Sequence, residues 1–558
     1  MDERFGPGPR AARLAALAVT ALAAACGGGG ADLVITGGSI WTGDAERPWA
    51  EALSVAGGAI AQVGSADEIG QAIGPGTQVF DLDGRFAMPG FIDTHTHFLD
   101  GGFRIAAVDL RDADSPEELA RRLSEYGAGL EEGEWILGGD WDHELWGGRL
   151  PDRAWIDSVT QRNPVFVTRL DWHMALANSR ALEIAGISPD TPPVAGGEVV
   201  RDAGGRLTGV FKDEAMSLVS DAIPRPSEAQ RDSALHAAMR HAASLGVTSV
   251  TDMGSWADLE TYERANSAGA LTVRVYAYVP LATVDSLARR VEADGRGDDW
   301  LRIGGLKGFV DGSLGSGTAL FDEPYSDEPD NTGLFVTPME DLEEQVRRAE
   351  AAGLQVAIHA IGDRAIRLLL DMYESVAADS GPRDRRYRVE HAQHLAPSEV
   401  ERFAQLGVVA AMQPYHAIDD GRWAERRIGG DRARLTYAFR SLMDAGAPVV
   451  FGSDWTVAPL DPLLGVYAAV TRRTLDGKRP GGWIPEQKVE VERAMSAYTS
   501  AASWAGFMEE RTGVLSPGRL ADVVVLSGNP IEVEAGGIRD LSVDATFVGG
   551  REVYSRHE

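Results

Sequence analysis

Five short apolar segments, each with a residue able to bind a metal ion at or near its C-terminal end, constrain the fold of this chain most strongly. Near-continuous apolar runs of this length are typical of parallel strands buried on both faces. In a (β/α)8 barrel, the catalytic groups lie at the C-terminal ends of several different strands. The segments therefore predict an α/β fold built on such a barrel. They are 91–97 (FIDTHTH), 301–312 (LRIGGLKGFVDG), 353–361 (GLQVAIHAI), 388–393 (RVEHAQ) and 448–455 (PVVFGSDW).

The first segment contains two histidines one residue apart, His95 and His97. Side chains on a strand repeat with a period of two, so both imidazoles point to the same side. Two neutral imidazoles on one face supply half of a divalent metal site. Taken alone, the pair is equally well explained as two unrelated histidines at an exposed strand end.

The order HxH, Lys, His, His, Asp resembles the binuclear metal pattern of the amidohydrolase superfamily. The match places His95 and His97 on strand one, Lys307 on strand four, His359 on strand five, His391 on strand six and Asp454 on strand eight. Local motifs narrow the resemblance to the branch that includes N-substituted formamide deformylases. These motifs are KGFVDGSLGS (307–316), HAIGDRA (359–365), RVEHAQ (388–393) and FGSDWTVAP (451–459), and the resemblance extends over residues 31–554.

The resemblance implies two divalent metal ions in this chain. The implied ligands are His95, His97 and Asp454 for the first ion and His359 and His391 for the second, with a carboxylated Lys307 bridging the two. Burial disfavours the ammonium form of a lysine, and the neutral amine can add CO₂ to give an anionic carbamate. Zinc is the default metal for such donors, while manganese, iron and cobalt also fit them.

The same resemblance implies a hydrolase that cleaves a C–N amide-type bond of a small molecule, as an N-substituted amide, a formamide or a cyclic amide. Two metals sharing a water lower its pKa toward neutrality. Asp454 would take the proton and pass it to the leaving nitrogen. One alternative is a ring deaminase of the same superfamily, whose members usually hold one metal. The other is a non-catalytic lipoprotein that binds a metal or a solute, which predicts an incomplete ligand set.

Each of these residues also has a purely structural explanation when it is considered alone. Lys307 would be a strand lysine whose ammonium group reaches solvent. His359 and His391 would be core histidines, and Asp454 would cap the following helix. The complete ordered set favours catalysis over these explanations. Asp93 is either a turn residue or an acceptor that orients a histidine, and the sequence does not distinguish the two.

A second group of residues consists of weaker candidates for the substrate pocket. The stretch 171–182 (DWHMALANSRAL) resembles an insertion motif of the superfamily that reaches the pocket. Its His173 would bind the substrate or its oxyanion, or else pack as a polar residue at the base of the loop. Asp311 and Ser313 are expected to shape the loop after Lys307, and His394 is expected to be structural. The remaining pocket candidates are Trp141, Asp142, Gln413, His416 and Trp455.

Both ends of the chain alternate apolar and polar residues with glycine turns, which is typical of short antiparallel strands. They predict one small β-sandwich built from residues 31–88 and 506–558. The barrel would then occupy residues 89–505. A long insertion after barrel strand one, at about 108–226, would lie over the barrel mouth.

The first 30 residues read as a signal peptide and tether, because a basic start and a short apolar run precede Cys26 and four glycines. Ala23–Cys26 resembles a bacterial lipoprotein box, which implies that Cys26 is lipidated and anchors an exported protein to a membrane. The alternative is a soluble secreted or periplasmic protein. The formal net charge of −31 argues against nucleic acid and anionic membrane surfaces as partners. The oligomeric state stays open, a homo-oligomer included.

Overall fold

Eight parallel strands form the central sheet of the computed structural model, which describes residues 30–105 and 107–556. The strands follow one another around the sheet in chain order, and parallel neighbours are joined by crossover connections, as expected for a barrel. They are β8 (Phe91–Thr96), β15 (Val247–Met253), β16 (Arg274–Pro280), β17 (Leu301–Phe309), β18 (Gln355–Ala360), β19 (Arg388–His391), β20 (Val409–Met412) and β21 (Val449–Phe451).

The first and last strands meet, which brings the two ends of the sheet together. The backbone N–H of Asp454 donates to the carbonyl of His95 at 2.7 Å, and that of His97 donates to the carbonyl of Trp455 at 2.6 Å. These bonds join the segment after β21 to the end of β8. The predicted first and eighth strand ends therefore lie side by side, although more than 350 residues separate them in the sequence.

Helices pack around the outside of the sheet with apolar residues at three- and four-residue spacing. In α10 (Asp363–Ser380), the buried positions include Ile366, Leu369, Leu370 and Tyr373, which form one stripe that faces the strands. The other helices of this layer are α2 (Phe98–Arg104), α6 (Glu228–Ser244), α7 (Trp256–Ser267), α8 (Val284–Asp294), α9 (Met339–Ala351), α11 (Glu399–Leu406), α12 (Pro414–Asp420), α13 (Ala424–Ala433), α14 (Phe439–Asp444), α15 (Pro462–Thr471), α16 (Val491–Ala497) and α17 (Ser500–Ala505).

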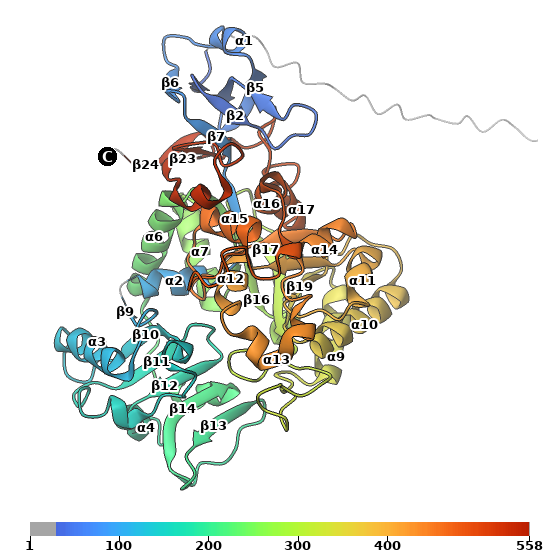
Figure 1. Cartoon of the computed structure of the whole chain (residues 1–558). Coiled ribbons are helices and arrows are strands. Elements are labelled where there is room, and N and C mark those ends of the chain that lie inside the picture. Colours follow the sequence, from blue (N-terminus) through green and yellow to red (C-terminus); the bar gives the residue numbers. More distant parts are fainter. Residues whose placement is uncertain (1–29, 106, 557–558) are drawn as a thin grey trace, which may run out of the picture.

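The insertion after β8 forms a mixed six-stranded sheet of its own. Its strands are β9 (Val108–Asp109), β10 (Ile136–Trp141), β11 (Val165–Arg169), β12 (Met174–Ala177), β13 (Gly197–Arg201) and β14 (Leu207–Asp213), and its helices are α3 (Pro116–Ala128), α4 (Ser179–Ile184) and α5 (Ser217–Ser220). This sheet lies at one end of the molecule, at the bottom of Figure 1. The loop between β11 and β12 lines a cavity together with residues from the C-terminal strand ends, so the insertion covers the barrel mouth.

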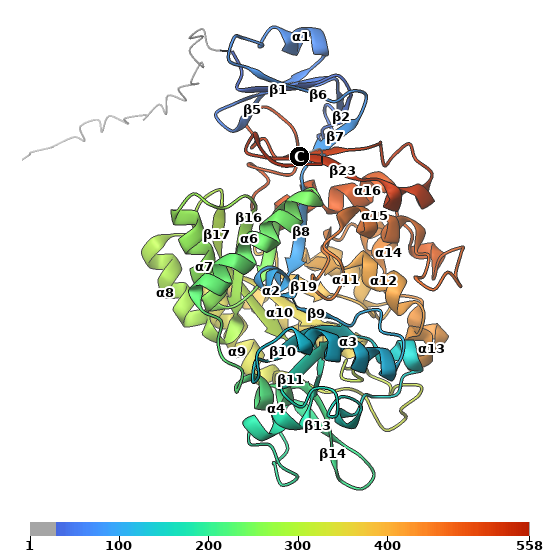
Figure 2. The same ribbon diagram turned by 90° about the vertical axis from the view of Figure 1, so that its left-hand side faces the viewer.

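Two further sheets at the opposite end contain strands from both chain ends (Figure 2). One holds β1 (Leu33–Thr36), β4 (Ala52–Ala56), β5 (Ala59–Gly64) and β6 (Gln78–Asp81). Helix α1 (Ala66–Gly70) lies between β5 and β6 in the chain. The other holds β2 (Ser39–Trp41), β3 (Trp49–Ala50), β7 (Phe86–Pro89), β22 (Val523–Leu526), β23 (Val543–Val548) and β24 (Arg551–Ser555). Their facing side chains share one apolar core, in which Phe80 packs against Phe547 at 5.1 Å between ring centroids.

The predicted fold class is confirmed: an α/β barrel with additional sheets from both chain ends and an insertion after the first barrel strand. Strands two, three and seven of the barrel are β15, β16 and β20. The predicted leader and Cys26 lie outside the described residues. Within residues 30–105 and 107–556, no helix has both the length and the apolar character needed to cross a bilayer.

Candidate metal centre and substrate cavity

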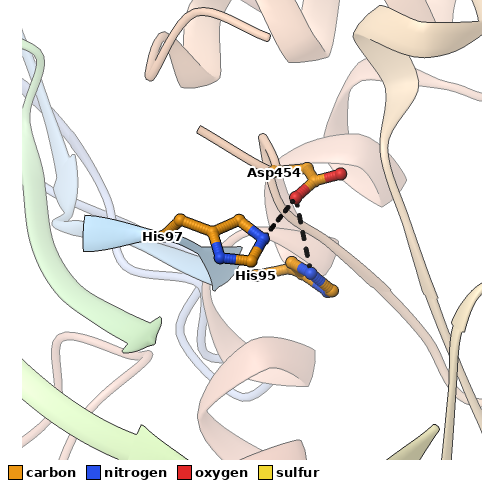
Figure 3. A group of neighbouring side chains, drawn as sticks. All are labelled: His95, His97 and Asp454. Carbon is orange, nitrogen blue, oxygen red and sulfur yellow. Dashed lines mark ion pairs between the residues drawn. The ribbon is translucent and has the colours of Figure 1, made fainter. Parts of the chain in front are cut away.

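Three predicted ligands converge where β8 and the segment after β21 meet (Figure 3). Oδ1 of Asp454 lies 3.5 Å from Nε2 of His95 and 3.4 Å from Nε2 of His97. The ligand atoms of the three residues all lie within 4.8 Å of one another. Oδ1 is buried and has no hydrogen-bond partner among the described residues. Because burying an unpaired carboxylate oxygen is costly, this donor set fits a cation held between the three side chains.

Asp93 stabilises the backbone beneath this cluster. Its carboxylate accepts the backbone N–H groups of His95 at 3.1 Å and Ser453 at 3.0 Å, so it ties β8 to the loop that carries Asp454. The sequence allowed two explanations of Asp93, a turn residue or an acceptor that orients a histidine. In the structure Asp93 is an acceptor, but it orients the backbone of His95 and not its imidazole. Burial raises the pKa of Asp93 to about 7, against the opposing effect of the Ser453 hydrogen bonds.

His95 is oriented by a buried glutamate on β19. Its Nδ1 lies 2.5 Å from Oε2 of Glu390, and Glu390 in turn accepts from Nε of Arg388 at 2.6 Å. Burial alone would raise the pKa of Glu390, but the charge of Arg388 and the hydrogen bonds from His95 and Arg388 outweigh it and hold this pKa well below its usual range. Burial, followed by the charge of Lys307, lowers the pKa of His95 to about 4. A neutral imidazole that donates Nδ1–H to Glu390 presents the lone pair of Nε2 to the cluster.

Lys307 lies within the same cluster. It is 6% exposed near the end of β17, and its Nζ is 3.4 Å from Nε2 of His95. Burial lowers the pKa of Lys307 to about 8, although the charges of Glu390 and Asp454 oppose the shift. At pH 7, one unit below this pKa, about one tenth of the amine is therefore uncharged.

The donor set at the predicted second metal position differs from the expected one. The ligand atoms of His391, His416 and Asp454 lie within 4.8 Å of one another. His416, on α12, has a buried Nε2 with no hydrogen-bond partner in the described part of the chain. His359 packs against His391 at 4.5 Å between ring centroids, but its Nε2 is 3.1 Å from the carbonyl oxygen of Gly312. His359 is not part of this group of three, and its role as a ligand of the second ion stays a prediction.

The insertion contributes a second histidine–carboxylate pair to the cavity. Nδ1 of His173 lies 2.5 Å from Oδ1 of Asp213, and its ring is 5.1 Å from that of His359. The other oxygen of Asp213 is buried and unpartnered among the residues described. Asp213 has a φ of +46°, a backbone conformation that is costly for a residue with a side chain. Burial would lower the pKa of His173, but the hydrogen bond and the charge of Asp213 outweigh it and raise this pKa.

These groups surround a cavity of about 220 Å³ at the barrel mouth. His97, Lys307, His359, His391, His416 and Asp454 line it from the barrel, and residues 169–173 line it from the insertion. A cavity of this size, apolar in part and with a few convergent polar groups, is the usual form of a small-molecule site.

Comparison with known proteins assigns the chain to a family. A family model described as the amidohydrolase family matches residues 78–554. The chain belongs to the amidohydrolase family. Protein LONG AFTER FAR-RED 3 of Arabidopsis thaliana is 42% identical to it over 537 residues, covering 94% of this chain and 92% of the plant protein. The N-substituted formamide deformylase of Arthrobacter pascens is 29% identical over 547 residues, covering 94% of this chain and 98% of the deformylase.

A solved structure agrees with this assignment. The uncharacterized metal-dependent hydrolase of Pyrococcus horikoshii OT3 superposes with a TM-score of 0.74 at 30% sequence identity, covering 90% of this chain and 99% of that one. The present amidohydrolase is thus a metal-dependent hydrolase with two His/Asp candidate metal sites.

Several predicted pocket residues of the amidohydrolase lie away from this cavity. Trp141 is fully buried in the insertion, where its Nε1–H donates to the carbonyl of Val167 at 2.9 Å. Asp142 is bound by Arg169 at 3.2 Å. Trp455 packs against Phe98 and His241 and lines a neighbouring cavity. These three side chains pack against neighbouring structure instead of facing the ligands, and of the five weaker candidates only His416 lines the cavity.

Other predicted residues hold the ligands or the loops around the site through hydrogen bonds. Oε1 of Gln413 accepts a hydrogen bond from Nδ1 of His391 at 2.9 Å, and Gln413 does not line the cavity. Asp311 accepts three backbone N–H groups, from Leu320, Ile361 and Gly362, and so shapes the loop after β17 as predicted. Ser313 lines the cavity and donates to Asp171. His394 pairs with Thr436 at 2.9 Å, outside the cavity.

The sequence analysis did not single out Glu390 and Asp213. Glu390 had a local signal, since it is an acid in the apolar strand 388–391 directly before a predicted ligand. Asp213 had none, because it ends β14 in the insertion, 40 residues from the histidine that it contacts.

Proposed function

We propose that this amidohydrolase cleaves the C–N bond of a small N-substituted amide, formamide or cyclic amide. The observation that carries the proposal is the buried, unpartnered Oδ1 of Asp454, placed between His95 and His97 and beside Lys307 at the wall of a small cavity. The likeness to a protein named N-substituted formamide deformylase supports the bond type.

The donor sets fit two divalent metal ions. His95, His97 and Asp454 would hold one ion, His391 and Asp454 would contribute to the other, and Lys307, as its carbamate, would bridge them. Zinc suits these nitrogen and oxygen donors, and manganese, iron or cobalt are compatible with them. Bound at these positions, such ions would lower the pKa of a water and polarise the substrate carbonyl.

Asp454 would move the proton in this reaction. Burial alone would raise the pKa of Asp454, but the electrostatic effect of the surrounding histidines, His95 first and then His97 and His391, outweighs it and holds this pKa well below its usual range. The carboxylate therefore stays ionised and able to accept a proton. Its Oδ2 points away from His95 and His97 (Figure 3) and would take the proton from water and return it to the leaving nitrogen.

His173 would bind the substrate carbonyl oxygen from the opposite side. With Nδ1 held by Asp213, its Nε2 has no hydrogen-bond partner among the described residues and belongs to a side chain that lines the cavity. Since Asp213 raises the pKa of His173, the imidazolium form, which donates from Nε2, is favoured. Such a donor stabilises the negative charge that develops on the carbonyl oxygen.

The test is hydrolysis of a panel of N-formyl and N-acyl amines by the zinc-loaded protein, followed as release of the primary amine. We expect turnover of at least one member, loss of turnover after chelation, and recovery when zinc is restored. Release of ammonia from aminopurines or aminopyrimidines, without cleavage of any amide, would contradict the proposal and favour ring deamination.

We also propose that Cys26 anchors the exported protein to a membrane through a lipid. The support is the leader sequence alone: a short apolar run, then Ala23–Cys26, then four glycines. Replacement of Cys26 by Ser should move the protein from the membrane fraction to the soluble fraction and leave the specific activity unchanged. A wild-type protein that is already soluble would show that the anchor is absent.

A further inference from the structure

One carboxylate at the substrate cavity forms no ion pair with the described residues. Asp420, at the C-terminal end of α12, lines the cavity and accepts a hydrogen bond from the hydroxyl of Tyr437 at 2.6 Å on Oδ2. Within the described residues, Oδ1 has no hydrogen-bond partner and Asp420 takes part in no ion pair. Tyr437 is itself neutral and also receives a hydrogen bond from Gln393, so it does not compensate the charge of Asp420.

The guanidinium groups nearest to Asp420 are already used by other carboxylates. Arg169 pairs with Asp171 at 2.6 Å and with Asp142 at 3.2 Å. Arg422 pairs with Asp419 and, at 3.2 Å, with Asp142. Of the three carboxylates that line this part of the cavity, Asp171 and Asp419 thus pair with arginines, and Asp420 is left without an ion-pair partner among the described residues.

The pKa of Asp420 agrees with the absence of an ion-pair partner. Burial raises the pKa of Asp420 to about 8, and the opposing hydrogen bond of Tyr437 and the charges of Arg169 and Arg422 do not offset it. The ionised form is thus disfavoured in the free protein. A cation that enters the cavity would favour it again.

The position of Asp420 on α12 sets how far its carboxylate lies from the candidate metal ligand His416. His416, whose Nε2 belongs to the second candidate metal group, lies four residues earlier on the same helix. Side chains at this spacing lie on one face of a helix, with Cβ atoms about 5–6 Å apart. Trp423 lines the cavity next to them, and an indole face attracts cations.

We infer that Asp420 is a specificity residue that binds a cationic ammonium group of the substrate. The substrate class is then an amide that carries an ammonium group about one helical turn from the bond to be cleaved. This inference rests on the proposed amide hydrolysis for the identity of the reacting bond, but the binding of a cation to the cavity does not depend on it.

The direct test compares choline with its neutral isostere, 3,3-dimethylbutan-1-ol, by calorimetric titration of the zinc-loaded protein. Both carry a hydroxyl group, so contacts of that group with a metal contribute to both. We expect choline to bind at least about tenfold more tightly, as a cation does when it faces a carboxylate and an indole away from bulk water. Asp420→Asn should remove this preference.

The matched control is Asp431→Asn on α13, which removes the same charge from a side chain that is 99% exposed. It should keep the full preference for choline. Equal binding of the two ligands by the wild type, undetectable binding of choline at about 10 mM, or a preference that persists in Asp420→Asn would each overturn the inference. Circular dichroism and zinc content, unchanged in both variants, would exclude misfolding.

A kinetic comparison separates this inference from the proposed function. N-Benzylformamide and its 4-aminomethyl derivative differ only in a distal ammonium group. Asp420→Asn should lower the ratio of kcat/KM for the derivative to kcat/KM for N-benzylformamide about tenfold, and Asp431→Asn should leave this ratio unchanged. If neither compound nor any other amide is cleaved, the proposed function fails, while the choline titration still decides the role of Asp420.

Discussion

Replacement of Glu390 by Gln tests how the metal centre is held together. Glu390 is fully buried, 2.5 Å from Nδ1 of His95 and 2.6 Å from Nε of Arg388. The substitution keeps the volume of the side chain but removes its charge. It leaves the guanidinium of Arg388 buried without a counterion, which typically costs about 3–5 kcal/mol of the free energy of unfolding. It also removes the acceptor that fixes the tautomer of His95, a loss that usually weakens metal binding about 10–100-fold.

Two measurements separate these effects. Denaturant unfolding of the metal-free protein gives the stability change, and competition with a chelator gives the zinc affinity. Glu350→Gln is the matched control, because Glu350 is also a buried glutamate paired with an arginine, Arg385, at 2.8 Å, but contacts no candidate ligand. It should lower stability without changing zinc affinity.

The double variant Arg388→Met/Glu390→Gln sharpens the test. Removing both charges should restore much of the stability, since no unpaired ion stays buried. The zinc affinity should remain low, because His95 still lacks its carboxylate partner. A Glu390→Gln protein with wild-type zinc affinity would refute the assignment of Glu390 as the group that orients His95.

Three further outcomes follow from the site. Burial lowers the pKa of Lys307 from 10.5 to about 8, so the metal-free fold is less stable below pH 8 and gains stability as the pH rises toward 10.5. Lys307→Met should abolish this pH dependence and raise the free energy of unfolding of the metal-free protein at pH 7 by about 3 kcal/mol, measured by denaturant unfolding. A variant with the same pH profile of stability as the wild type would contradict this. Asp454→Asn should lower kcat at least about 100-fold with the circular dichroism spectrum intact, and near-wild-type turnover would mean that another group carries the proton. Elemental analysis of His416→Ala and His359→Ala should show which histidine holds the second ion. We expect the zinc content to fall from about two to about one per chain in the His416 variant and to stay at about two in the His359 variant. The reverse result would restore the ligand set implied by the sequence resemblance.

Strand periodicity accounts for much of what the sequence predicted correctly. A buried parallel strand needs only its own apolar run, so 353–361 and 388–393 were recognisable without their neighbours. The strand ends of a barrel meet at one rim, and therefore His95, Lys307, His391 and Asp454 were expected to converge. They do converge, across more than 350 residues of sequence, because the fold and not the local sequence brings β8 beside β21.

The remaining features depend on how separate segments dock. Periodicity places a residue on one face of a strand but does not say what lies opposite it, so Glu390 beside His95 and Asp213 beside His173 were not predicted. Trp141 looked like a pocket residue only because the packing of the insertion was unknown.

By itself, the sequence determined the barrel, the order of its strands and the residues at their C-terminal ends, since apolar runs and period-two alternation are local properties of the chain. Only the tertiary structure placed His416 beside His391 and Asp454, showed which carboxylates pair with arginines, and showed that Asp420 faces the cavity without an ion-pair partner among the described residues. The reason is physical: electrostatic pairing acts over a few ångströms in space and has no fixed spacing along the sequence.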